Sequence, residues 1–354
     1  MVDLSLYQLE PPPGGGFHFG EEGLELEASS LCFASDSLFA ALVAALAEQR
    51  GAKAADDFVA PFAEGKPPFL LASVFPYVGR LPLLPLPHLQ IVTEKPMERK
   101  FAKKTKFVSP QILARLRQGT EMDDVIDEAG NGRFLQNGAI WLTAAEQAHL
   151  PQDWPNLAAS ALRHQTVWQQ GSVPRVTLDR VSSTSNIYLM GRVNFNQGCG
   201  LWFGVEYVAE GWRERVETLL HHLGDRGIGG ERANGYGAFT PRLPAQLEPP
   251  LRPIPGEDNM SHRLLLSRYA PQEGEIAALQ DDGASYQLVR VGGWLASPQH
   301  ESLRRKRATL LSEGSVVGQE VQGRLVDVTP DYDGFPHPVY RYGLALTVGV
   351  QSSS

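Results

Sequence analysis

Cysteine is scarce in this sequence. Cys32 and Cys199 are the only two among 354 residues, and neither belongs to a C-x-x-C pair. Two distant thiols indicate neither a disulfide framework nor a zinc ribbon, and they suit a reducing cytoplasm. Long apolar runs are also missing, because the longest, residues 38–47, has half the length that a membrane span needs. The first ten residues lack the basic segment of a secretory signal, so we expect a cytoplasmic protein without membrane contact.

An excess of positive charge is absent as well. The chain has 32 Lys and Arg against 40 Asp and Glu, which gives a net charge of −8. A protein that coats nucleic acid non-specifically would be basic overall, so only a local basic groove is compatible with this balance. The composition is 42% hydrophobic and 20% charged, as in globular proteins, and 354 residues suffice for about two domains.

The first 80 residues read as strand, helix, strand. Residues 2–10 predict a strand, and residues 35–50 predict a helix with one apolar stripe. Ser35 or Asp36 is the expected cap at the start of this helix. Residues 69–78 predict a buried strand. This order predicts a small α/β or ferredoxin-like unit.

The middle of the chain is less regular and then regains order. Residues 79–170 contain a proline-broken segment, a basic run and a short helix from about Pro110, and we interpret them as an insertion. Residues 175–196 contain two β-rich segments around a polar turn, which predicts a hairpin. A strand at 200–208 and a helix at 212–224 follow.

A proline-rich segment marks the expected domain boundary. Six prolines lie between residues 241 and 255, and this density favours an extended linker. The sequence therefore predicts an N-terminal domain at 1–240, a linker at 241–260 and a smaller, β-rich domain at 261–354. The fold class expected from this order is α+β.

A glycine-rich stretch, GDRGIGGERANGYGAFTP (224–241), follows the 212–224 helix and contains six glycines. A dinucleotide fingerprint needs G-x-G-x-x-G on a turn from a strand into a helix. Here Arg232 takes the place of the third glycine, and the loop leaves a helix instead of entering one. No P-loop sequence occurs. We therefore expect no nucleotide cofactor.

The same stretch is well suited to another ligand. Glycines allow close approach of a second backbone, and successive N–H groups can form an anion nest. Arg226 and Arg232 offer charge-assisted contacts, and Tyr236 offers a ring for base stacking. The alternative is structural: a helix C-cap at Gly224 or Gly227, followed by an ordinary turn.

The pattern G-x-G-G-x-R-x-x-G-x-G-x-F from Gly227, between a helix and a strand, resembles the C-terminal glycine-rich loop of the RAMP superfamily. These are RNA-binding proteins of CRISPR–Cas systems. FHFGE (17–21), SDSLFAAL (35–42) and PRVTLDRVSSTS (174–185) are similar to one branch of it. Together they resemble the family of the fourth subunit of the type III-A Csm interference complex, over about residues 1–240.

The resemblance implies two ferredoxin-like (RRM-like) domains and a non-catalytic subunit that holds the repeat-derived 5′ handle of crRNA in antiviral defence. It implies as partners the large signature subunit and a backbone RAMP subunit, with target RNA nearby. Cleavage of target RNA belongs in that family to the backbone subunits, and DNase and cyclase work to the large subunit. An equivalent subunit of a sister type III complex is the alternative.

The candidate RNA contacts are arginines, lysines and the glycine loop. Arg175 and Arg180 match the arginine segment of the family, and a guanidinium fork suits phosphate; ion pairs to Asp179 are the alternative. A basic run at 99–106 and a second at 304–307 read either as ligand contacts or as solvated segments, the second on a helix face or a protein-contact surface. The candidate RNA-binding residues are Arg175, Arg180, Gly227, Gly229, Gly230, Arg232, Gly235, Tyr236, Gly237, Lys100, Lys103, Lys104, Lys106 and His18.

His18 also carries the main rival hypothesis. Repeat-processing relatives use a histidine as general acid and base, and an imidazole titrates in the range that this needs. His18 has no recognisable catalytic partner in the sequence, and His221 and His222 lack the neighbours of a metal site. We therefore expect neither catalysis nor a metal, with a His18-dependent, metal-independent repeat endoribonuclease and a protein-only scaffold as the alternatives.

Overall fold

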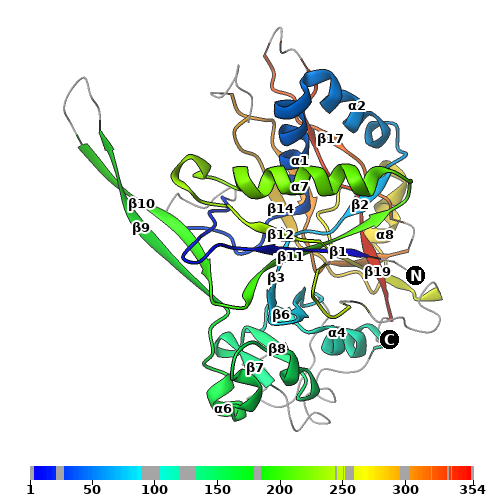
Figure 1. Cartoon of the computed structure of the whole chain (residues 1–354). Helices are drawn as coiled ribbons and strands as arrows, with labels where there is room; N and C mark the ends of the chain where they lie inside the picture. The colour runs from blue at the N-terminus through cyan, green and yellow to red at the C-terminus, as the bar shows by residue number, and fades with distance from the viewer. Residues whose placement is uncertain are drawn as a thin grey trace.

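The computed structural model describes residues 4–20, 28–88, 104–119, 133–178, 185–243, 245–249, 251, 259–295, 303–319, 321–332, 335 and 337–351. It is a mixed α+β structure with several antiparallel sheets (Figure 1). Within the described ranges, none of the helices combines the length and the apolar character that crossing a membrane requires.

The central sheet brings strands from both ends of the first 242 residues together. Its two middle strands, β1 and β11, pair antiparallel, with Tyr7 opposite Phe203. In spatial order the sheet consists of β12 (Thr240–Arg242), β1 (Ser5–Glu10), β11 (Cys199–Tyr207), β3 (Phe75–Val78) and β4 (Leu81–Pro82), and β2 (Phe69–Leu71) also pairs with β11. Along the chain, a helical segment separates β1 from β2 and β3, and a second one separates β11 from β12.

Three helices cover one face of this sheet (Figure 1). They are α1 (Ser35–Arg50), α2 (Ala52–Ala63) and α7 (Trp212–Arg226). Side chains alternate between the faces of a strand, so Leu201 and Phe203 of β11 join the helix-face core, while Trp202 joins the core of the opposite face. The central sheet is therefore buried on both sides.

The opposite face carries the inserted region and part of the C-terminal region. The insertion forms a sheet in the order β5 (Leu84–Pro85), β6 (Phe107–Val108), β8 (Ile140–Leu142) and β7 (Arg133–Leu135). Beside it lie α4 (Pro110–Arg117), η1 (Gln136–Gly138), η2 (Ala145–His149), η3 (Trp154–Asn156) and α6 (Ala159–Leu162). Leu113 of α4, Trp141 of β8 and Val348 of the C-terminal region belong to one opposite-face core.

The C-terminal region is rich in short strands, as the sequence predicts. A three-stranded sheet has the order β16 (Val316–Gly318), β13 (His262–Leu265) and β19 (Thr347–Val350). Two two-stranded sheets pair β14 (Leu288–Val291) with β15 (Ala308–Leu311), and β17 (Val326–Asp327) with β18 (Tyr340–Arg341). Two short helical segments are η6 (Glu273–Glu275) and α8 (Ile276–Leu279).

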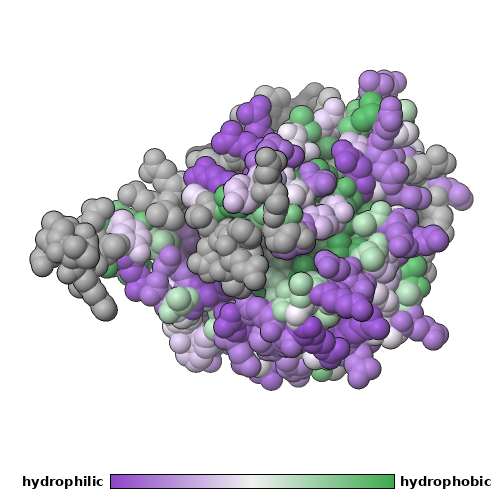
Figure 2. All heavy atoms as spheres, turned by 90° about the horizontal axis from the view of Figure 1, so that it is seen from above, coloured by the Kyte–Doolittle hydropathy of each residue, from purple (hydrophilic) through white to green (hydrophobic). Residues whose placement is uncertain are grey.

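A long hairpin projects from the body (Figures 1 and 2). It consists of β9 (Trp168–Leu178) and β10 (Ser185–Phe195), which pair antiparallel from Leu178 opposite Ser185 to Trp168 opposite Phe195. The structure thus confirms the hairpin that the sequence predicts, with an earlier start. It leaves the body at the end of the insertion and returns directly into β11.

Some local predictions were wrong. Ala34 is the N-cap of α1 without a side-chain cap, because Ser35 and Asp36 are committed to distant partners. The Ser35 Oγ accepts a hydrogen bond from the Arg268 N–H at 2.9 Å, and Asp36 binds Arg341. The segment 69–78 is two strands, not one. Residues 304–307 are not helical, and Arg304 forms a β-bridge with Trp294.

Part of the proline-rich segment lies against the body. The Glu248 N–H donates to the carbonyl oxygen of Arg80 at 2.8 Å, and the Glu248 carboxylate pairs with the Arg80 guanidinium at 2.6 Å. Leu247 and Leu251 pack on the opposite-face core. These described residues of the segment are therefore anchored to the body.

The two cysteines are expected to differ in reactivity. Cys199 is 3% exposed, and burial raises the pKa of its thiol to about 12, whereas Cys32 is partly exposed. Only the thiolate attacks an alkylating reagent. Iodoacetamide at pH 8 should therefore leave Cys199 unmodified in the folded protein and label it after unfolding in urea, as peptide mass spectrometry would show. Rapid labelling of Cys199 in the folded chain would contradict this prediction.

Candidate nucleic-acid interface

The glycine loop begins where α7 ends. Gly227 is the C-cap, with a φ of 78°, and its N–H donates to the Leu223 carbonyl oxygen at 2.7 Å. The structure thus confirms the C-cap that the sequence offers at this position. The loop then folds back, because the Ile228 N–H donates to the carbonyl oxygen of Gly237 at 3.0 Å. Between these residues, η4 (Arg232–Asn234) leaves Arg232 exposed.

The bare backbone of the loop faces a segment of the same chain, residues 14–20. The Gly230 N–H donates to the His18 carbonyl oxygen at 2.8 Å, and the Gly237 N–H donates to the Gly16 carbonyl oxygen at 2.9 Å. A Cβ at Gly229 would lie 2.4 Å from the His18 carbonyl oxygen. The close approach that the glycines permit is therefore filled within this chain by its own N-terminal segment.

The other side of this segment lies against the hairpin. Phe17 and Val193 exchange two backbone hydrogen bonds, of 2.8 and 2.9 Å. The Nδ1 of His18 lies 2.9 Å from the Gly191 carbonyl oxygen, and the Asn194 amide donates to the Gly15 carbonyl oxygen at 2.9 Å. The glycine loop, residues 14–20 and the base of the hairpin thus form one unit, which we call the junction.

Two arginines of the hairpin hold the ring of Tyr236 inside the junction. The guanidinium carbons of Arg175 and Arg192 lie 5.3 and 5.6 Å from the ring centroid, within the range of cation–π attraction. Tyr236 is 5% exposed. Its ring is thus engaged by its own chain and largely buried in this conformation. Within the described part of the chain, Nε of Arg175 and Nε of Arg192 have no hydrogen-bond partner.

The hairpin is amphipathic. Arg175 pairs with Tyr188, and Arg192 lies four residues beyond Tyr188 on β10, so the period of two places all three on one face. The other face carries Val176 and Ile187, which lie directly opposite each other and are 56% and 69% exposed. Hydrophobic atoms are visible on the projecting arm in Figure 2.

The structure brings most, but not all, of the predicted site residues together. Arg175, His18, Tyr236 and the loop glycines meet in the junction, and Arg232 and Gly235 lie on its exposed rim. Lys104 and Lys106 are exposed and lie just before β6. The sheet that contains β6 is on the other side of the central sheet from α7 (Figure 1). Arg180, Lys100 and Lys103 lie outside the described residues.

Arg192 is the residue that the sequence reading missed. Its strand was predicted, but its role depends on register: only the pairing of Arg175 with Tyr188 shows that Arg192 points to the same side. Side chains alternate between the two faces of a strand, so the face of Arg192 could have been predicted from the sequence if the position of the hairpin turn, and hence its register, had been known.

His18 is buried within the junction. The residue is 5% exposed, and one ring nitrogen is bound to the Gly191 carbonyl oxygen. Among the residues that the structure describes, no group of three or more His, Cys, Asp or Glu side chains could hold a metal ion.

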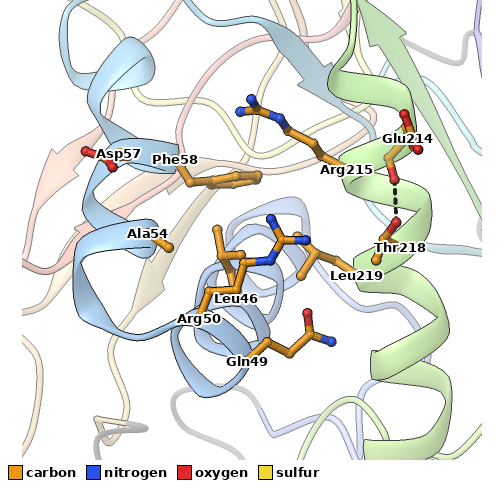
Figure 3. A pocket seen from close by; sticks show the side chains of 10 residues that line it. All are labelled: Leu46, Gln49, Arg50, Ala54, Asp57, Phe58, Glu214, Arg215, Thr218 and Leu219. Carbon is orange, nitrogen blue, oxygen red and sulfur yellow. Dashed lines mark hydrogen bonds between the residues drawn. The ribbon is translucent and has the colours of Figure 1, made fainter.

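A groove of about 340 Å³ lies between α1, α2 and α7 (Figure 3). Leu46, Phe58 and Leu219 supply its apolar side chains, and Arg50 and Arg215 stand at its rim. It runs along the first half of α7, whereas the glycine loop follows the last turn of that helix. The groove is thus separate from the junction.

Comparison with known proteins shows which proteins this chain resembles. Residues 258–350 match the family model of the CRISPR Csm4 C-terminal domain. The proteins named CRISPR system Cms protein Csm4 from Mycobacterium tuberculosis and from Thermococcus onnurineus are both 26% identical to the chain. The first comparison covers 95% of each chain, and the second covers 90% of this chain and 91% of the relative.

Solved structures agree in fold. The chain is similar to one in the Csm3–Csm4 subcomplex of a type III-A CRISPR–Cas interference complex, with a TM-score of 0.69 and 18% identity over 98% of this chain and 99% of that one. It is also similar to one in a Csm1–Csm4 cassette with cA4, with a TM-score of 0.54 and 19% identity over 99% of both chains.

The α+β architecture, with a glycine loop closed on residues 14–20 and an attached hairpin, is thus similar in fold to these solved structures. Over nearly its full length the chain is similar to Csm4 proteins of CRISPR systems.

Proposed function

We propose that this chain is the non-catalytic subunit of a type III-A effector complex that binds the repeat-derived 5′ handle of crRNA. The observation that carries the proposal is the junction, where a glycine loop, two arginines and a projecting hairpin meet on one structural unit. Guanidinium groups suit a phosphate backbone, because their planar fork can bind two of its oxygens. Single-stranded RNA is commonly bound in this way, by contacts to phosphates and to splayed bases.

The proposed partners follow from the solved relatives. One of these is named for a subcomplex with Csm3 and another for a cassette with Csm1. We propose that this chain likewise joins a backbone subunit to the large signature subunit. Its net charge of −8 fits a protein whose RNA groove is completed by neighbouring subunits.

We also propose the finer architecture. The order β1, helices, β2 and β3, β11, α7, β12, with β1 and β11 central, fits a ferredoxin-like domain over residues 1–240 with an insertion at about 79–170. The region after the 241–260 linker would be the second ferredoxin-like domain, 261–354.

Within the junction, we assign the RNA contacts to atoms that are not already used by the chain. Arg232 is exposed on the loop, and Arg175 and Arg192 are partly exposed on the hairpin, although their unpartnered Nε atoms are buried. The glycines act indirectly, because they let the loop close on residues 14–20. Lys104 and Lys106 would serve a separate stretch of RNA, on the other side of the central sheet.

The exposed apolar face of the hairpin is expected to contact RNA bases or a paired guide and target. In the double variant Val176→Ser and Ile187→Ser, stability should change by less than about 0.5 kcal/mol, because both side chains are exposed. RNA affinity of the assembled complex should fall at least tenfold, since fully burying even one of these two side chains contributes about 1.5–3 kcal/mol. Filter binding with labelled target RNA measures this. Val208→Ser, at a position 66% exposed, is the matched control, and equal effects of both changes would contradict the prediction.

The decisive experiment is purification of the tagged full chain with its native complex, followed by sequencing of the bound RNA. Shared repeat-derived 5′ ends are the expected result, and a protein without RNA would point to a scaffold. Incubation of the purified chain with labelled repeat RNA in EDTA should give no product. A discrete cut that is lost in His18→Ala would overturn the proposal in favour of an endoribonuclease.

A further inference from the structure

Two arginines of the C-terminal region converge on one glycine. A Cβ at Gly293 would lie 3.6 Å from an Nη of Arg305 and 3.8 Å from an Nη of Arg341. Gly293 has a φ of +116°, where side chains are rarely accommodated. Arg341 is 4% exposed, and Arg305 is partly buried above it. The two guanidinium groups therefore share one sparsely hydrated site.

The positive charge at this site is not balanced. Asp36 binds Arg341, and it is the one carboxylate in contact with the arginine pair in the described part of the chain. Burial, and then the neighbouring charge of Arg341, lower the pKa of Arg305 to about 10, so Arg305 remains cationic at neutral pH. The Nε atoms of Arg305 and Arg341 are buried without hydrogen-bond partners among the described residues. Buried charges normally have partners, so this arginine pair is suited to bind an anion.

An aromatic platform lies beside the arginine pair. Trp294 follows Gly293 and is 54% exposed, and the guanidinium carbon of Arg304 lies 4.5 Å from its ring centroid. Backbone hydrogen bonds from Arg305 N–H to Gly293 at 3.0 Å and from Leu295 N–H to Leu303 at 2.9 Å hold the two segments together. A fixed, exposed tryptophan next to cations is typical of single-stranded nucleic-acid binding, whereas an acidic protein segment would need no stacking ring.

Successive contacts connect this place to the junction. His18 binds Gly230, and the ring of the next residue, Phe19, lies 4.8 Å from that of Phe33. Phe33 precedes α1, whose Asp36 holds Arg341. A series of contacts through Phe19 and Phe33 thus runs from the glycine loop to the start of α1 and to Arg341.

We propose that Arg305 and Arg341 bind a phosphate of single-stranded RNA, with the adjoining base stacked on Trp294. The inference rests on the proposed function, because it extends the RNA path from the junction to the C-terminal region. Arg305 supplies the accessible guanidinium, and Asp36 fixes Arg341 beneath it. A paired guanidinium arrangement suits phosphate better than lysine does.

The test is fluorescence anisotropy of the full-length chain with a 5′-labelled single-stranded RNA of the repeat sequence, over a series of salt concentrations. Arg305→Gln should weaken binding severalfold and lower the slope of log K against log salt by about 0.7, the value for one phosphate contact. Trp294→Ala should weaken binding by roughly five- to one hundredfold, as for one lost stacked base, with an unchanged slope.

Lys306→Gln is the matched control. Lys306 neighbours Arg305 but pairs with the exposed Asp331 at 2.5 Å, so the same charge change should leave the salt slope as it is. If Arg305→Gln destabilises the chain, Arg305→Lys provides the second variant, with the slope retained and the affinity reduced severalfold. A slope for Arg305→Gln equal to those of the wild type and of Lys306→Gln would overturn the inference.

The remaining outcomes separate this inference from the proposed function. Wild-type protein that binds and co-purifies with no RNA would refute both. Wild-type protein that retains RNA, while Arg305→Gln loses only a protein partner in an RNase-treated pull-down, would refute the phosphate site alone and assign the arginine pair to a protein contact.

Discussion

The variant Gly237→Val is expected to lose about 3–5 kcal/mol of unfolding free energy, at the upper end of what single substitutions cost. Its Cβ would lie 2.0 Å from the carbonyl oxygen of Ile228, which is backbone and cannot turn away. Gly237 also has a φ of +81°, which a β-branched residue resists. The loop would have to open, and it would release the hydrogen bond to Gly16 and the Tyr236 ring with it. Urea unfolding monitored by circular dichroism measures the stability, and co-purified crRNA measures the function.

Gly235→Ala is the matched control for this experiment. Gly235 has nearly the same φ, +80°, but a Cβ there would meet nothing within 4 Å. The backbone strain alone costs about 1–2 kcal/mol, and the loop should stay closed with its RNA retained. Equal losses in both variants would mean that the close approach of Ile228 does not matter.

The variant Asp36→Ala is expected to lose about 3–5 kcal/mol, because breaking a buried ion pair leaves one charge without compensation. Asp36 and Arg341 are 1% and 4% exposed, and they join the first turn of α1 to β18. Replacement of both partners, as Asp36→Leu with Arg341→Met, should recover much of that loss, since buried ion pairs can often be exchanged for apolar residues. Thermal and urea unfolding of the single and double variants give the comparison.

An exposed ion pair provides the reference. Glu48 of α1 binds Arg226 of α7 at 3.0 Å, and their side chains are 37% and 54% exposed. Glu48→Ala should cost at most about 1 kcal/mol. If Asp36→Ala costs no more than Glu48→Ala, the buried pair does not hold the C-terminal region to α1.

Sequence patterns predicted those elements that are determined by residues close together in the chain. The helices around residues 35–50 and 212–224, the hairpin and the C-cap at Gly227 follow from periodicity, capping and turn residues within a few positions of one another. The role of Asp36 was beyond such reasoning, because its partner lies 305 positions further along the chain. An acidic residue in a first helical turn reads as a cap or dipole partner from sequence, and only the fold shows that it is an anchor.

For the candidate site, too, the sequence predicted the location of the loop but not its distant contacts. The glycine spacing located the loop, but which chain would lie against it could not be known, because residues 14–20 reach it from the far end of the sequence. Tyr236 was interpreted as a base-stacking ring, yet Arg175 and Arg192 engage it from the hairpin. The segment 304–307 was interpreted in one alternative as a helix face from its charge run, but β-pairing with Trp294 determines its conformation.

The opposite-face core has a consequence for biosynthesis. Its members include Trp141 of the insertion together with Val348 and Val350 of the last strand and Leu346 just before it, and the Arg117 side chain donates to the Gly349 carbonyl oxygen at 2.8 Å. While the ribosome is still translating, these apolar residues of the insertion lack their final cover. Folding of the insertion is thus completed only after the last strand has emerged, and prematurely terminated chains expose aggregation-prone surface.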